Sequence, residues 1–279
     1  MIKPDKLRFG TAGIPWAAKE AGTAGGVQKV RELGLDAMEL EFVRNVNISR
    51  EKAPLVKEAA KKHDILLTCH GSYFINLNSK EKEKLQASIN RIMQAAAITH
   101  LCGGWSVCFH SAYYSGVDHK KVYDNVKEIL EHIVKNLREH DIDIWIRPET
   151  GGKLNQFADS FELIKLASEV DGVMPCFDIA HQYARSNGKW NTYEDFSKLL
   201  AEVEKVLGKN GLHNMHMHTE GINFSDKGEK NHVNLNECKL NYKDLVRAWK
   251  DFGVKGVVIS ESPNIEEDAL LLQKEYLKL

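Results

Sequence analysis

The sequence predicts an α/β protein with a single domain, residues 1–279, folded as a closed (β/α)8 barrel, the TIM barrel. Three observations support this prediction. Short apolar runs alternate with longer amphipathic segments eight times over 279 residues, which is about 35 residues per unit. Strands that alternate with helices pair in parallel through right-handed crossovers. No linker divides the chain, and the segment FGTAGIPWAAKEAGTAGG after the first apolar run lacks the glycine spacing of an open, phosphate-binding sheet.

The eight apolar runs are the expected strands. A nearly continuous apolar run is typical of a parallel strand that is buried on both faces. In chain order these runs are Leu7–Gly10, Ala37–Phe42, Ile65–His70, Trp105–His110, Ile142–Glu149, Val173–His181, Leu212–His218 and Gly256–Glu261.

The segments between these runs are the expected helices, because several carry apolar residues at positions i, i+3 and i+4. Ser79 and Ser160 are the expected N-caps of two of them. In chain order the helical segments are Gly25–Leu33, Arg50–His63, Lys80–Thr99, His119–His140, Ser160–Glu169, Thr192–Leu207, Tyr242–Phe252 and Ile265–Leu277.

The composition excludes several classes of protein. Hydrophobic residues make up 43% and charged residues 28%, which is typical of a globular chain and not of a disordered one. No apolar run approaches the roughly 18 residues of a membrane span, and MIKPDKLRFG is not a signal peptide. The net charge of −1 excludes a strongly basic coat for nucleic acid. We therefore expect a cytoplasmic monomer without membrane contacts.

The five cysteines do not form a CxxC pair, and most lie in apolar runs. This distribution predicts reduced, buried thiols.

Six consecutive expected strands end in histidine, aspartate or glutamate. The carboxyl ends of barrel strands form one rim, which carries the active site in enzymes of this fold. The rim residues are His70, His110, Glu149, Asp178, His181, His216 and Glu261. His218 lies two residues after His216, on the same face of the strand, and is a reserve member of the set.

This concentration of side chains predicts a metal centre. Three carboxylates on one rim repel each other, and burying them unpaired costs several kcal/mol. Divalent ions remove that cost, and imidazole with carboxylate suits zinc, manganese or iron. The scarcity of thiolates at the rim argues against a structural zinc–thiolate site there. Seven ligands are too many for one catalytic zinc, which usually takes about three. Two or three ions fit, and such clusters clamp the oxygens of a phosphodiester.

Six ordered motifs resemble endonuclease IV, the zinc-dependent apurinic/apyrimidinic endonuclease. They are CHGSYFINL (69–77), FH (109–110), ETGGK (149–153), CFDIAH (176–181), MHMH (215–218) and SESP (260–263). The resemblance implies a TIM barrel with three zinc ions that binds DNA containing an abasic site. It also implies cleavage of the phosphodiester 5′ to that site in base-excision repair, which leaves a 3′-hydroxyl.

The resemblance further implies a role for each residue. The first zinc would be held by His70, His110 and Glu149. The second would be held by Glu149, Asp178, His216 and Glu261, with Glu149 as the bridging ligand and the catalytic residue. His181 and His232 would belong to the third zinc, and Tyr73 would enter the DNA at the lesion.

The sequence also departs from the family pattern. The third zinc normally takes an Asp-x-His pair, but here DKGEKNH places Lys230 in the aspartate position. Glu229 and Asp226 are the two candidate replacements beside His232. The basic stretch 227–230 is expected to be a solvated loop.

Two other functions remain open. The first is a sugar isomerase or epimerase of the xylose-isomerase-like barrels, in which a quartet such as Glu149, Asp178, His216 and Glu261 holds one manganese. The additional histidines, His70, His110 and His181, favour the nuclease because an isomerase needs no second metal. The second is a non-catalytic DNA-binding or scaffolding protein that has kept a metal site.

Overall fold

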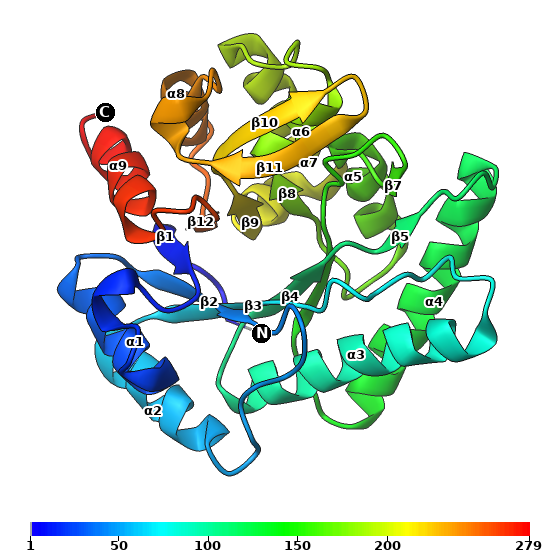
Figure 1. Cartoon of the computed structure of the whole chain (residues 1–279), viewed down its shortest axis with the longest axis horizontal. Helices are drawn as coiled ribbons and strands as arrows, with labels where there is room; N and C mark the ends of the chain where they lie inside the picture. Colours follow the sequence, from blue (N-terminus) through cyan, green and yellow to red (C-terminus); the bar gives the residue numbers. More distant parts are fainter. Residues whose placement is uncertain (1) are drawn as a thin grey trace.

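The computed structural model describes residues 2–279 and is built around a barrel of eight parallel strands. The barrel strands are β1 (Leu7–Ala12), β2 (Ala37–Glu41), β3 (Leu66–His70), β4 (Ser106–Phe109), β6 (Trp145–Pro148), β8 (Cys176–Asp178), β9 (Met215–His218) and β12 (Gly256–Ser260). Figure 1 shows these strands at the centre of the molecule, with the helices outside them. The predicted (β/α)8 architecture is confirmed.

The strands follow one another around the barrel in chain order. Seven parallel pairings give the order β6-β4-β3-β2-β1-β12-β9-β8. Two isolated parallel bridges, Ile146 with Val173 and Glu149 with Cys176, join the remaining edges. The sheet therefore closes, and the carboxyl ends of all eight strands meet at one rim.

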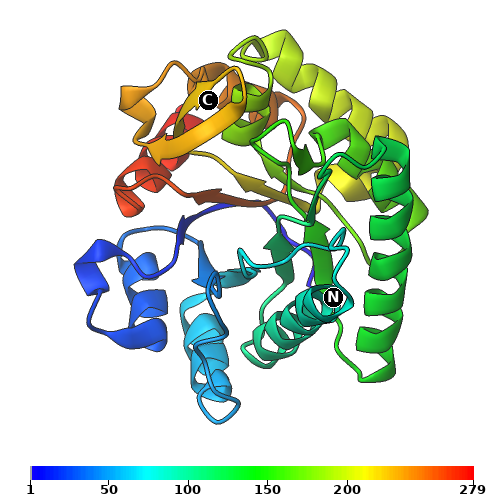
Figure 2. The same cartoon turned by 45° about the vertical axis from the view of Figure 1, so that its right-hand side comes forward.

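A helix follows each barrel strand on the outside of the sheet. These helices are α1 (Gly22–Glu32), α2 (Ala53–His63), α3 (Lys82–Leu101), α4 (His119–Glu139), α5 (Ser160–Glu169), α7 (Tyr193–Leu212), α8 (Tyr242–Asp251) and α9 (Glu266–Leu277). Figure 2 shows the long helices α3 and α4 running along the outside of the barrel. Helix α5 is capped by Asp159 and α3 begins after Glu81, so the predicted N-caps Ser160 and Ser79 are wrong. Asp159 takes the cap because its carboxylate accepts two backbone N–H groups of the first turn.

Short elements that the sequence did not predict lie in the loops at the rim. They are α6 (Ile179–Arg185), the 3-10 turns η1 (Trp16–Ala18) and η2 (Leu235–Glu237), the pair β5 (Ala112–Tyr113) and β7 (Gln156–Phe157), and the hairpin β10 (Gly221–Ser225) with β11 (Gly228–Val233). Residues 227–230, expected in a solvated loop, form the turn of this hairpin and the start of β11, with Lys227 and Lys230 exposed.

Glycine fixes the hairpin to the barrel. Gly228 has a φ of 94°, in the left-handed region that favours glycine. A Cβ at this position would lie 2.3 Å from the carbonyl oxygen of Gly152, in the loop after β6. The close approach holds β11 against that loop and brings its side chains over the rim.

The core has two parts. The larger part lies between the sheet and the helices. The smaller part lies inside the barrel and consists of Ala37, Leu66, Trp105, Val257 and Ile259. Toward the rim, the buried side chains inside the barrel are polar.

Among the described residues, no helix is long and apolar enough to cross a membrane. The five cysteines are free and four of them are buried.

Candidate metal centre at the barrel rim

Glu149 is the centre of the rim site. Its side chain follows β6 and is fully buried. Carboxylate oxygen Oε2 lies 3.0 Å from His70 Nε2 and 3.6 Å from His110 Nδ1. The other oxygen, Oε1, lies 3.4 Å from His218 Nδ1 and 3.5 Å from His181 Nδ1. One carboxylate therefore faces imidazoles from four different segments.

Three of the groups that the rim side chains form, each with its ligand atoms within 4.8 Å of one another, correspond to the three predicted ions. The first group is His70, His110 and Glu149. The second group is Glu149, Asp178, His218 and Glu261. The third group is His181, Glu229 and His232. Glu149 belongs to the first two groups, which is the arrangement expected of a bridging ligand.

The prediction that His216 belongs to the rim is not met by the structure. His218 occupies the place in the second group that was predicted for His216. His216 Nε2 lies 3.0 Å from Glu39 Oε2, deeper in the barrel. The register of β8 against β9 gives the reason, because Asp178 pairs with His218 whereas Cys176 pairs with His216. Two residues along a strand span about 6.6 Å, so only the later histidine reaches the rim.

The third group depends on α6 and the hairpin. Asp178 caps α6 by accepting the backbone N–H of His181, which turns that imidazole back over the rim. His181 Nε2 lies 3.3 Å from His232 Nε2 and 3.6 Å from Glu229 Oε2. Asp226 is exposed on the hairpin. Of the two candidate replacements, the structure brings Glu229 to the histidines.

Gly152 leaves room for this group. A Cβ at Gly152 would lie 2.7 Å from both Glu229 Oε2 and His181 Cδ2. Any larger residue would therefore displace the two candidate ligands.

Three buried or half-buried carboxylates at the site were not among the residues that the sequence predicted. Glu39 and Glu41 lie on β2, and Glu220 follows β9. Glu220 is fully buried and groups with Asp178 and His181. The alternation in AMELE and the position of Glu220 two residues after His218 were signals that could have revealed them.

The electrostatics show how strongly the acids depend on their neighbours. Burial would raise the pKa of Glu149, but His110 and His70 outweigh it and hold that pKa well below its ordinary value. Asp178 has no such surplus of imidazoles, and burial raises its pKa to about 7. Burial also raises the pKa of Glu220 well above its ordinary value. Burial lowers the pKa of His110 to about 4.

The donor set fits transition-metal ions. Buried polar atoms that make no hydrogen bond of acceptable geometry include His110 Nδ1, Asp178 Oδ2 and both carboxylate oxygens of Glu220. Leaving such atoms unpaired costs several kcal/mol. A cation bound among them would remove this cost, and imidazole with carboxylate is the donor set of zinc, manganese and iron.

Tyr73 lies at the same rim and points outward. Its side chain is 60% exposed, and its ring meets the His70 ring edge-on at 5.6 Å between centroids. Phe74, beside it, is 63% exposed and lies under the guanidinium of Arg91. Tyr73 is therefore free to contact a ligand placed over the candidate metal centre.

The fold defines this protein as a TIM barrel with candidate metal ligands at its rim. Comparison of the sequence with known families gives the same class. The profile of the family described as "Xylose isomerase-like TIM barrel" matches residues 27–278. The chain belongs to this family.

Two individual proteins are related to this chain in sequence. An uncharacterized protein of Methanocaldococcus jannaschii is 42% identical over 273 residues, covering 98% of each chain. A probable endonuclease 4 of Staphylococcus aureus is 26% identical over 211 residues, covering 72% of this chain and 68% of that protein.

Solved structures show the same fold in two kinds of enzyme. Endonuclease IV from Thermus thermophilus has a TM-score of 0.74 at 19% identity, covering 96% of this chain and 98% of the other. A D-tagatose 3-epimerase-like protein has a TM-score of 0.72 at 20% identity, covering 96% and 97%. The fold alone therefore does not separate nuclease from epimerase.

Proposed function

We propose that this chain is a zinc-dependent endonuclease that cleaves the phosphodiester 5′ to an abasic site in DNA. The observation that carries the proposal is the presence of two groups of candidate ligands that share Glu149, with a third group beside them that His181 joins to Glu149. A phosphodiester needs charge compensation on both the attacking and the leaving oxygen, which clusters of metal ions supply. The sequence relationship to a probable endonuclease 4 supports the same function.

The first two groups would hold two zinc ions through Glu149, and the third group would hold another. When bound, zinc ions lower the pKa of water toward about 7 and neutralise charge on phosphate oxygens. Glu149 is ionised, because its imidazole neighbours hold its pKa low. It can therefore accept a hydrogen bond from a water molecule and orient that water at the rim.

Tyr73 would contact the DNA. Its exposed ring stands beside His70, a residue of the first group. An aromatic side chain stacks on any base, so it can fill the gap that a missing base leaves in a duplex. The metal-binding residues would then face the phosphate next to that gap.

The test is cleavage of a duplex with one abasic site by the wild-type protein and by Glu149→Gln. We expect the variant to lose at least about a hundredfold in rate, the loss typical of removing one preorganised electrostatic group. Glu83→Gln makes the same change on the exposed surface of α3 and should leave the rate unchanged. A Glu149→Gln rate within tenfold of the wild-type rate, at full metal occupancy, would contradict the role of Glu149.

A sugar epimerase is the second candidate. The observation that favours it is the quartet Glu149, Asp178, His218 and Glu261, which is sufficient to hold one ion. Epimerisation of ketohexoses, with no cleavage of abasic DNA, would select this function. Cleavage of abasic DNA without epimerisation would select the nuclease.

A further inference from the structure

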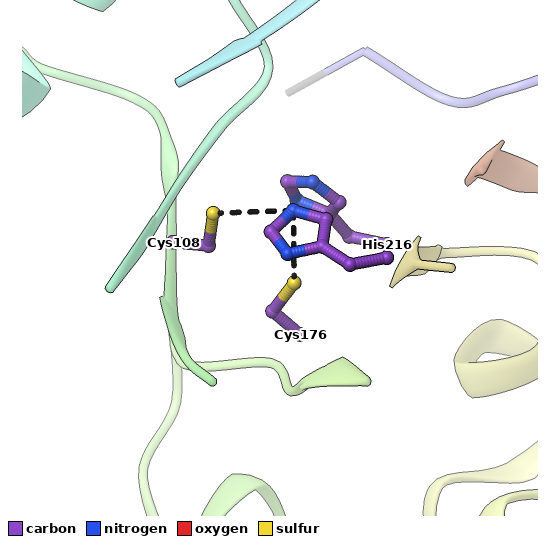
Figure 3. Close-up of side chains that lie close together, drawn as sticks. Cys108, Cys176 and His216 are labelled. Atoms are coloured by element: carbon purple, nitrogen blue, oxygen red, sulfur yellow. Dashed lines mark hydrogen bonds between the residues drawn. The ribbon is translucent and has the colours of Figure 1, made fainter. Parts of the chain in front are cut away.

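A second cluster of metal-binding side chains lies below the rim, inside the barrel. It consists of Cys108 on β4, Cys176 on β8, and His216 and His218 on β9, with Glu39 of β2 beside them. All of these residues are fully buried. Figure 3 shows the two cysteines pointing from their strands toward the histidine rings of β9. The proposed nuclease function uses only His218 of this cluster.

The distances within the cluster fit a tetrahedral zinc site. His218 Nε2 lies 3.7 Å from Cys108 Sγ and 3.7 Å from Cys176 Sγ. The four donor atoms of the two cysteines and two histidines lie within 4.8 Å of one another. In a tetrahedron with Zn–S of about 2.3 Å and Zn–N of about 2.0 Å, sulfur and nitrogen ligands lie about 3.6 Å apart. The side chains therefore need little movement to share one ion.

His216 is oriented as a metal ligand. Its Nδ1 lies 3.0 Å from the Ser106 hydroxyl oxygen, which fixes the ring with Nε2 directed into the cluster. Metal-bound histidines commonly have such a partner at their other nitrogen. His216 Nε2 is buried and makes no hydrogen bond of acceptable geometry, although Glu39 Oε2 lies 3.0 Å away.

Charge also favours a divalent ion. Two thiolates neutralise one divalent cation, so a filled site carries no net charge from the metal and its sulfur ligands. Glu39 Oε1 lies 2.9 Å from His218 Nε2, close enough for the carboxylate to approach the same ion. Thiolate with imidazole selects zinc over magnesium or calcium.

We propose that Cys108, Cys176, His216 and His218 bind a buried structural zinc ion inside the barrel, in addition to the metals at the rim. Closed sites of this ligand type contribute directly to folding. His218 faces both sites, because its Nδ1 lies 3.4 Å from Glu149 Oε1 at the rim. Coordination of the inner ion by Nε2 and of a rim ion by Nδ1 would make His218 a deprotonated, bridging imidazolate that links the two sites.

The first test is X-ray absorption at the zinc edge on the wild-type protein. We expect sulfur neighbours at about 2.3 Å, which the rim groups cannot supply because they contain no cysteine. Cobalt-substituted protein should likewise show sulfur-to-metal charge-transfer absorption. Zinc-loaded wild-type protein without either signal would overturn the proposal, and this result requires no variant to fold.

The second test uses matched cysteine variants. Cys108→Ser with Cys176→Ser should remove about one zinc per chain and abolish the sulfur signal. Cys69→Ser is the control, because Cys69 is equally buried but packs in the core outside the sheet. It should keep both the zinc and the signal, and loss of the signal in this control would contradict the assignment.

A third comparison separates this site from the proposed nuclease. His232→Ala changes the rim and should leave the sulfur signal intact. Wild-type protein with the sulfur signal but no cleavage of abasic DNA would refute the nuclease and leave the proposal of the inner site intact.

Discussion

Single buried carboxylates dominate the electrostatics of the barrel interior. Glu149 faces several imidazoles and stays ionised, whereas burial raises the pKa of Asp178 to about 7 and that of Glu41 to about 8. The difference arises from neighbours, since Glu41 also feels the negative charges of Glu39 and Glu261. Without a metal, the fold therefore holds acids that favour the protonated form.

Glu41 gives a prediction about pH. Its folded-state pKa of about 8 lies above the ordinary value of 4.5, so between these values the folded protein keeps a proton that the unfolded chain has released. The free energy of unfolding of the metal-free protein should therefore fall as pH rises through this window. Glu41→Gln should remove part of that fall, so that the variant gains stability over the wild type from about pH 5 to about pH 8.

Urea unfolding in the presence of a chelator measures this difference. Glu83→Gln serves as the control on an exposed helix surface. A stability difference between Glu41→Gln and the wild type that stays constant over this pH range would refute the explanation.

Tyr73 gives a prediction about DNA binding. Tyr73→Ala should weaken binding to abasic DNA by about 1–3 kcal/mol, the range measured for base–aromatic stacking in single-strand complexes. Binding to intact duplex should change less, because no gap is present for the ring to enter. Fluorescence anisotropy with both duplexes measures the effect, and metal content should stay constant.

Phe74→Ala is the matched control. Phe74 is equally exposed, but the ring that packs against His70 belongs to Tyr73. Equal losses on abasic and intact DNA for Tyr73→Ala would make this residue a general contact.

At the scale of elements, the hairpin β10–β11 decides whether a third metal site exists. It carries both Glu229 and His232, and α6 supplies His181 from the opposite side. The close approach of Gly228 to the loop after β6 and the packing of Tyr183 of α6 against Phe224 of β10 bring these elements together. The site therefore depends on the packing of two short elements that lie outside the regular barrel.

The hairpin yields a prediction about metal content. His232→Ala, His181→Ala and Glu229→Gln should each remove about one zinc per chain, because each contributes a donor to the third group. Asp226→Asn should remove none, since Asp226 is exposed on the same hairpin. Mass spectrometry of the native proteins gives the count. Full zinc content in all three variants would show that the hairpin holds no metal.

At the scale of the whole molecule, the barrel concentrates acids that metal ions would compensate. Carboxylates reach the interior from β2, β6, β8, β9 and β12 or the residues that follow them; they are Glu39, Glu149, Asp178, Glu220 and Glu261. Ions that bind only the folded state stabilise it by mass action. Metal content should therefore govern the stability of the whole barrel.

Metal removal should lower the melting temperature of the wild-type protein by about 5–10 °C for each ion that is lost. This range follows from about 2.7 kcal/mol per site at a hundredfold excess over Kd, and from a shift of about 2–4 °C per kcal/mol in a protein of this size. Zinc should restore the melting temperature and magnesium should not, because the donors include imidazoles. An unchanged melting temperature in protein shown to be metal-free would contradict this view.

The sequence by itself determined the architecture and the kinds of ligand. The eight apolar runs are local signals, so strands such as β3 and β12 could be predicted within a residue or two. His70, His110, Glu149 and Glu261 each come at the end of a strand, and in a parallel barrel that position alone assigns them to the rim.

Only the tertiary structure decided which side chains meet. His216 and His218 share one face of β9, and the sequence cannot say which reaches the rim because that depends on the register against β8. The packing of the hairpin places Glu229, and not Asp226, beside His181 and His232. Closure of the barrel brings Cys108 close to Cys176, although these residues are 68 positions apart in sequence. Side-chain alternation is a local property of a strand, whereas register and closure are properties of the whole barrel.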